Sequence, residues 1–234
     1  ASHPRIHVFL SSSDIHVLHQ LRKDREQVMD MAVEAVRRAR RHCDDVEFSP
    51  MDASRTDMDY LYQLVEAVIN AGATTINIPD TVGYAMPWEF RERIENIKRN
   101  VPNIGKAVLS VHCHNDLGQA VANSLAAVRA GVRQVQGTLN GLGERCGNAN
   151  LISLIPTLQL KLGYDCVTPQ QLRQTTELSR YVGELSNTPP DPFMTYVGHS
   201  AFAHKAGLHA SAIKVDPDLY QHMDPLGVGN DMRL

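Results

Sequence analysis

The sequence predicts an α/β fold of parallel strands, and three features of its 234 residues indicate this. Short apolar stretches alternate with amphipathic helical stretches, glycine follows some of the predicted helices, and polar residues collect where the predicted strands end. Strands that alternate with helices of this length form parallel βαβ units. Polar clusters at the carboxyl ends of such strands are typical of the active face of a (β/α)8 TIM-type barrel, with a doubly wound sheet as the alternative.

Strand and helix patterns follow one another along the chain. Strands are expected at 5–11, 45–50, 74–78, 107–112 and 132–138, and helices at 24–42, 58–71, 87–100, 117–130 and 148–162. Pro87 suits the first turn of a helix, and Gly72 and Gly131 come where a helix ends and a left-handed residue is tolerated. Polar clusters end the strands at 11–14, 49–56, 80–81, 112–116 and 140–150. We expect a partial (β/α)8 catalytic barrel, incomplete at its N-terminus, over residues 1–167 and, beyond it, a helical segment over 168–234 that contains a proline-rich linker at 187–192.

The composition is that of a soluble globular protein. Hydrophobic residues make up 43% of the chain and its net charge is −3, which suits one substantial core. The chain has no apolar run long enough to cross a membrane and no basic patch with interleaved aromatic residues, so we expect neither a membrane nor a nucleic acid as partner. Its cysteines show no zinc-binding or paired spacing, which favours reduced thiols in a cytoplasmic protein.

The stretch 110–116 combines an apolar strand with two histidines at its carboxyl end. Successive side chains of a strand point to opposite faces, so His112 and His114 project from the same face and lie close enough to share a divalent metal. The alternative is that they are two unrelated surface histidines.

A glycine-rich loop at 140–150 is the second dense motif. Gly141, Gly143 and Gly147 let the backbone turn sharply and approach a ligand, and Asn148 carries an amide oxygen that suits a hard cation. Because the loop follows the strand with the two histidines, it is the natural source of a further metal ligand. The alternative is an ordinary turn between a strand and a helix.

Several motifs in the same order resemble one enzyme family. They are Ser-Asp-Ile-His at 13–16, Val-Glu-Phe-Ser at 46–49, His-Cys-His-Asn-Asp at 112–116, Gly-Glu-Arg-x-Gly-Asn-Ala at 143–149 and Ala-Phe-Ala-His-Lys-Ala-Gly-Leu-His at 201–209. Together they resemble the group of 2-isopropylmalate, homocitrate and citramalate synthases, over essentially the whole chain. The resemblance implies a barrel that holds a divalent metal and condenses acetyl-CoA, as co-substrate, with a 2-oxo acid.

The resemblance also implies which residues act. They are His112, His114 and Asn148 for the metal (Mg, Mn or Zn), His7, Ser49, Thr81 and Arg145 for the substrate, and Glu144, His209 and Tyr220 for catalysis. In related dimers the segment after the barrel reaches into the partner's barrel, so the resemblance implies a homodimer.

The sequence departs from the family pattern at Met51, where the family usually has a glutamate. Methionine cannot accept a proton, so Asp52, a metal-bound water or His209 would have to serve as base, or turnover would be slow or absent. A second departure is that the chain begins at what resembles the third strand of the barrel, without the metal-ligating aspartate of the first. The missing strands are expected to be disordered, removed, supplied by another chain or part of a longer gene product. Asp24-Arg25-Glu26 spells the first-strand motif but is predicted to form a solvated helix start.

The resemblance favours 3-methyl-2-oxobutanoate as the 2-oxo acid and 2-isopropylmalate, the first committed product of leucine biosynthesis, as the product. Pyruvate, which gives citramalate, and 2-oxoglutarate, which gives homocitrate, are the alternatives. A barrel lyase that cleaves a related metal-bound acid is a second class of function. A catalytically degenerate, metal-binding relative is the third, and Met51 and the absent first strand favour it.

Overall fold

A computed structural model describes residues 2–234, and the contacts divide the chain into two compact units. The first unit comprises the residues up to 137 together with 143–149, and the second comprises 138–142 together with 150–234.

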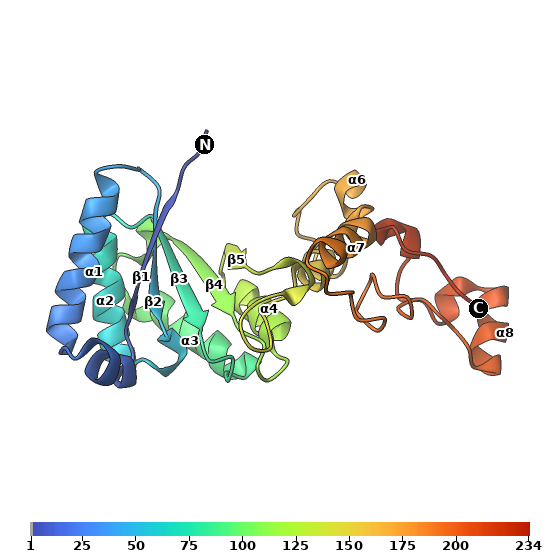
Figure 1. The fold of residues 1–234 in the computed structure, drawn as a ribbon, viewed down its shortest axis with the longest axis horizontal. Coiled ribbons are helices and arrows are strands. Elements are labelled where there is room, and N and C mark those ends of the chain that lie inside the picture. The colour runs from blue at the N-terminus through green and yellow to red at the C-terminus, as the bar shows by residue number, and fades with distance from the viewer. Residues whose placement is uncertain (1) are drawn as a thin grey trace. The chain divides into compact units, whose positions relative to one another are not determined.

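The first unit contains a five-stranded parallel sheet whose strands lie side by side in chain order (Figure 1). The strands are β1 (Ile6–Ser11), β2 (Val46–Met51), β3 (Thr75–Asp80), β4 (Val108–Cys113) and β5 (Gln134–Gln136). The helices between them are α1 (Arg25–Arg40), α2 (Met58–Ala71), α3 (Pro87–Asn100) and α4 (Ala120–Arg129). Strands in chain order, each joined to the next through a helix, are the arrangement of part of a (β/α)8 barrel. The predicted α/β fold is confirmed, as a partial barrel.

The helix starts follow the capping residues of the sequence. Asp24 accepts a hydrogen bond from the backbone N–H of Gln27 at 2.8 Å, which confirms that this segment begins α1. Asp57 caps α2 in the same way through Tyr60. The helix expected from residue 117 begins only at Ala120, because Gly118 adopts a left-handed φ of 70°.

Two segments differ from the expected elements. A π-helical turn at His16–Leu21 follows β1, where no element was expected. The helix expected at 148–162 consists of α5 (Leu151–Pro156) and a π-helical turn at Thr157–Lys161. Pro156 has no backbone N–H to donate, which accounts for the change of helix type at this residue.

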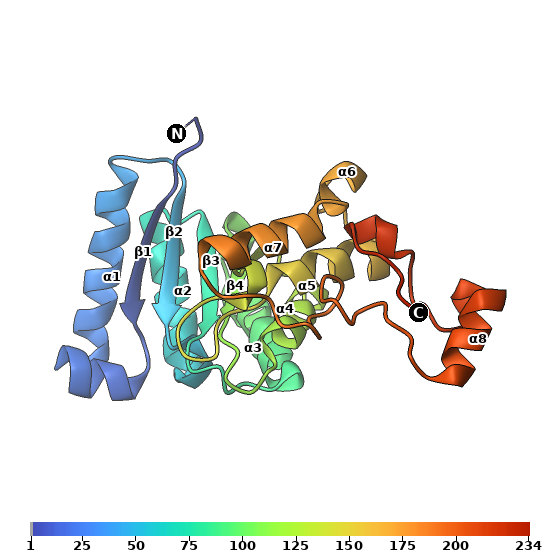
Figure 2. The ribbon, with the colours of Figure 1, turned by 45° about the vertical axis from the view of Figure 1, so that its right-hand side comes forward.

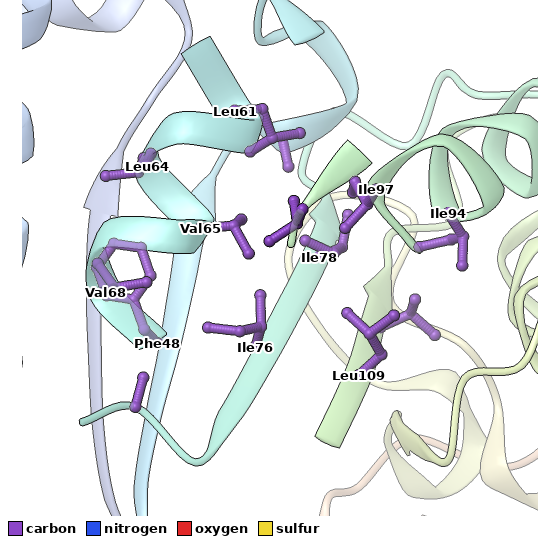
Figure 3. Packing of buried hydrophobic residues seen from close by; sticks show 14 of the residues in the cluster. Phe48, Leu61, Leu64, Val65, Val68, Ile76, Ile78, Ile94, Ile97 and Leu109 are labelled. Atoms are coloured by element: carbon purple, nitrogen blue, oxygen red, sulfur yellow. The ribbon is translucent and has the colours of Figure 1, made fainter. Parts of the chain in front are cut away.

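The hydrophobic core of the first unit lies between the sheet and its helices. Figure 3 shows side chains of α2 and α3 packed against Ile76, Ile78 and Leu109 of the sheet. Ile76 and Ile78 are fully buried. Alternation along the strands therefore sends one set of side chains into an apolar layer.

The other set of strand side chains is polar and forms a hydrogen-bonded layer on the opposite face of the sheet. Its members are Arg5, which precedes β1, and His7, Glu47, Ser49, Asn77, Ser110, His112, Gln134 and Gln136 of the strands. This face is the one that lines the interior of a barrel.

The second unit combines short helices with long irregular segments and is drawn from yellow to red in Figure 2. Besides α5, its helices are α6 (Pro169–Leu172), α7 (Thr175–Leu185) and α8 (Gly207–Val215). A small core of Leu172, Phe202 and Val228 holds part of it together. Within residues 2–234, no helix has the length and apolar character that a membrane span requires.

Candidate metal and substrate site

His112 and His114 lie at the carboxyl end of β4. Their side chains are on the same side of the chain, as the alternation of side chains along a strand predicts. Their ring centroids are 5.2 Å apart, with the ring planes tilted by 50°. His112 is on the polar face of the sheet, and its Nδ1 lies 3.0 Å from Oε1 of Gln136. The structure thus presents two imidazoles side by side.

The glycine-rich loop brings Asn148 beside these histidines. His114 and Asn148 form an isolated backbone bridge, and the N–H of Ala149 donates to the carbonyl of Cys113 at 2.9 Å. A Cβ at Gly143 would lie only 2.2 Å from Nδ2 of Asn148, so glycine at this position makes room for the amide. The three predicted metal ligands therefore lie together.

This set of donors fits a divalent cation. Nδ1 of His114 is buried without a hydrogen-bond partner among the described residues. Burial, reinforced by the neighbouring His112, lowers the pKa of His114, so its imidazole stays neutral and keeps a lone pair for a cation. Between residues 2 and 234 no group of three or more His, Cys, Asp and Glu side chains is placed to bind a metal. The role of Asn148 as a further ligand stays a prediction.

The predicted substrate residues lie in two pairs. Nε2 of His7 is 2.7 Å from Oγ of Ser49, and Nδ2 of Asn77 donates to the same hydroxyl at 2.9 Å. These three side chains belong to the polar face of neighbouring strands. Asn77 was not predicted, although its place in the alternation of β3 could have indicated it.

Arg145 and Thr81 form the second pair, through the backbone. The Arg145 guanidinium donates to both oxygens of Asp116, at 2.7 and 2.9 Å, and to the carbonyl of Thr81 at 2.9 Å. These bonds hold the pKa of Asp116 below its usual range. In this structure Arg145 thus joins the loops that follow β3, β4 and β5, and its role in binding substrate stays a prediction. Glu144, beside it, is exposed.

His209 and Tyr220 lie in the second unit and contact each other. Their rings stack with centroids 4.1 Å apart and an interplanar angle of 26°. His209 belongs to α8, and Tyr220 follows a short 3₁₀ turn at Pro217–Leu219. Their catalytic role stays a prediction.

Met51 ends β2 and pairs in register with Ser11. The next residue, Asp52, is fully buried and accepts hydrogen bonds from Ser13 at 2.5 Å and Arg55 at 2.9 Å. These contacts stabilise a left-handed residue with a φ of 67°. They give Asp52 a structural role and do not favour it as a replacement base.

Two models of known families match the chain. The model described as HMGL-like matches residues 1–182, which is most of the chain. The chain belongs to the HMGL-like family. The model described as homocitrate synthase post-HMGL domain-like matches residues 196–234 of this HMGL-like chain.

Curated relatives and solved structures agree with this family. The chain is 50% identical over 230 residues to the 2-isopropylmalate synthases of Syntrophus aciditrophicus and Ruminiclostridium cellulolyticum, covering 98% of the chain and 45% of each relative. It therefore spans about half the length of the curated relatives it matches. An HMG-CoA lyase from Acinetobacter baumannii is similar in structure, with a TM-score of 0.65, 21% identity, and coverage of 81% of this chain and 64% of that one. That likeness supports the partial barrel fold.

Proposed function

We propose that the protein is an acyltransferase that condenses acetyl-CoA with 3-methyl-2-oxobutanoate to give 2-isopropylmalate and CoA. The observation that carries the proposal is the 50% identity to two 2-isopropylmalate synthases over 98% of the chain. The neighbouring positions of His112, His114 and Asn148 support it, because the reaction needs a group that polarises a 2-oxo acid.

The reaction forms one carbon–carbon bond. The acetyl methyl loses a proton to a base, the resulting carbanion attacks the 2-oxo carbon, and the alkoxide that forms takes up a proton to become a hydroxyl group. Water then cleaves the thioester, which leaves a carboxylate and releases CoA. His112, His114 and Asn148 would hold a divalent cation (Mg, Mn or Zn), which would act as a Lewis acid on the 2-oxo group. His7 and Ser49 supply hydrogen-bonding groups for the acid on the polar face of the sheet. The family resemblance implies the roles of the remaining residues. These are substrate binding for Thr81 and Arg145, and catalysis for Glu144, His209 and Tyr220.

The choice of 2-oxo acid is the finer part of the proposal. One or two methyl groups in an apolar pocket discriminate by only about 1 to 3 kcal/mol, so pyruvate is an alternative substrate. 2-Oxoglutarate, which carries a second carboxylate, is the other alternative. The lyase from Acinetobacter baumannii is in complex with coenzyme A and 3-methylmalate. The reaction proposed here likewise releases CoA and forms a substituted malate. We further propose a cytoplasmic homodimer.

Thiol release tests this function. The full-length protein is given acetyl-CoA with each of the three acids in turn, with Mg²⁺ or Mn²⁺ and again after chelation. Release with 3-methyl-2-oxobutanoate that disappears on chelation would support the proposal. Release with only one of the other two acids would contradict the proposed substrate. No release with any of the three acids would contradict the proposed synthase activity.

A second candidate is a metal-binding relative without turnover, which Met51 favours. The variant Met51→Glu restores a carboxylate at the end of β2 and distinguishes the two candidates. Thiol release by Met51→Glu but not by the natural protein would support the degenerate relative. Equal release by both would show that another group serves as base.

A further inference from the structure

Glu47 is a buried carboxylate on the polar face of the sheet, where it accepts hydrogen bonds from Arg5, Gln134 and Gln136 and lies 3.5 Å from Nε2 of His7. Its side chain is 2% exposed and forms an ion pair with Nη1 of Arg5 at 3.0 Å. Nε2 of Gln134 donates to the same oxygen at 3.0 Å, and Nε2 of Gln136 donates to the other oxygen. A carboxylate paired with arginine accepts hydrogen bonds and donates none. The group of Gln136 that faces Glu47 must therefore be its NH₂.

This requirement fixes the other end of the same amide. With its NH₂ on Glu47, Gln136 presents its carbonyl oxygen to Nδ1 of His112, at 3.0 Å. The two residues are partners in the register between β4 and β5, so the strands hold this contact. A carbonyl oxygen accepts only, so Nδ1 of His112 must carry a hydrogen, and a neutral ring then has its lone pair on Nε2.

We propose that Gln136, oriented by Glu47, is a positioning residue that selects the Nδ1–H tautomer of His112 and leaves Nε2 open to a divalent cation. This inference rests on the metal site of the proposed function. It extends that site to Glu47 and Gln136, which are not among the proposed metal ligands. Partners of this kind orient metal-binding histidines, and their loss typically weakens metal affinity by about 10–100-fold.

Gln134 provides a matched control. It is on the same strand and the same face as Gln136, and it also donates to Glu47. Its other hydrogen bonds are with Ser110 and Arg5, and none of the described hydrogen bonds joins it to His112. Gln136→Leu and Gln134→Leu therefore remove similar groups from one buried network, and only the first removes the acceptor of His112.

The tautomer can be read without a metal. Solid-state ¹⁵N NMR of the metal-free, full-length protein labelled at histidine is recorded at about pH 8.5, where an ordinary imidazole is neutral. The His112 signals are assigned by their loss in His112→Ala. We expect a protonated Nδ1 and an unprotonated Nε2 in the natural protein and in Gln134→Leu, and loss of this preference in Gln136→Leu and Glu47→Gln. An Nε2–H tautomer in the natural protein would overturn the inference.

Mn²⁺ affinity, measured by calorimetry, is the second readout and separates this inference from the proposed function. We expect Gln136→Leu to bind Mn²⁺ about 10–100-fold more weakly than Gln134→Leu. Equal affinities of these two variants would overturn the role of Gln136. If the natural protein bound no Mn²⁺ while His112 kept the Nδ1–H tautomer, the proposed metal site would be contradicted. The orientation of His112 by Glu47 and Gln136 would still be supported.

Discussion

Individual side chains at the carboxyl ends of the strands are held in place by close packing and paired charges. Gly143 leaves the space that the amide of Asn148 fills, and Arg145 binds Asp116 with two hydrogen bonds. At this scale the site depends on a few contacts, and each can be removed separately.

Gly143→Ala should weaken cation binding. The new Cβ would lie 2.2 Å from Nδ2 of Asn148, so the amide must leave the position that it has beside Gly143. We expect a loss of Mn²⁺ affinity of about tenfold or more by calorimetry. Gly105→Ala is the matched control, because a Cβ at Gly105 meets nothing within 4 Å. An unchanged Mn²⁺ affinity in Gly143→Ala would contradict the role of Asn148 as a metal ligand.

Arg145→Met should raise the pKa of Asp116 toward its usual value. The hydrogen bonds and charge of Arg145 lower the pKa of Asp116 in the folded protein. The pair thus stabilises the fold at a pH above the unfolded pKa of about 3.9, and this contribution is lost as the pH falls through the lower folded pKa.

A ¹³C NMR titration of the Asp116 carboxyl measures the shift. Arg41→Met serves as control, since Arg41 pairs with Glu34 on α1 and not with Asp116. An Asp116 pKa that is the same in the natural protein and in Arg145→Met would contradict the ion pair.

At the scale of elements, the sheet has two chemically distinct faces, and each depends on strand alternation. The apolar side chains of β3 and β4 pack against α2 and α3, while the polar ones form the network that reaches His112. The apolar face supplies the stability of the first unit, and the polar face supplies its candidate chemistry.

Ile76→Ala should destabilise the first unit by about 2–5 kcal/mol, because it leaves a cavity beneath α2. Ile76 is fully buried, whereas Val108, at the start of β4, is 44% exposed. Val108→Ala should therefore change the free energy of unfolding by no more than about 0.5 kcal/mol. Chemical denaturation measures both variants. Similar losses in the two would contradict the assignment of the faces.

At the scale of the whole molecule, the sequence predicted the elements better than their contacts. Periodicity and capping residues located α2 and α3 at their observed bounds, since helix period and caps are local properties. The contact between His112 and Gln136 depends on the register of β4 and β5, which no local pattern states. The ion pair of Arg145 with Asp116 joins two loops 29 residues apart, and the stacking of His209 on Tyr220 likewise depends on tertiary structure.

The contacts divide the molecule into two units in a way that the strand and helix pattern of the sequence does not indicate. Contacts assign residues 138–142 to the second unit and 143–149 to the first, so the chain crosses between units within the glycine-rich loop region. The proposed boundary at residue 167 followed the strand and helix pattern alone, and it stays a prediction.

The central claim is that His112, His114 and Asn148 form one divalent cation site, and Mn²⁺ binding followed by pulsed EPR tests it most directly. We predict that the full-length protein binds Mn²⁺ with nitrogen couplings from imidazole. His112→Ala and His114→Ala should each abolish these couplings or reduce them, while His19→Ala, at an exposed position, should leave them unchanged. Binding without imidazole couplings, or couplings unaffected by loss of His112 and His114, would contradict the account.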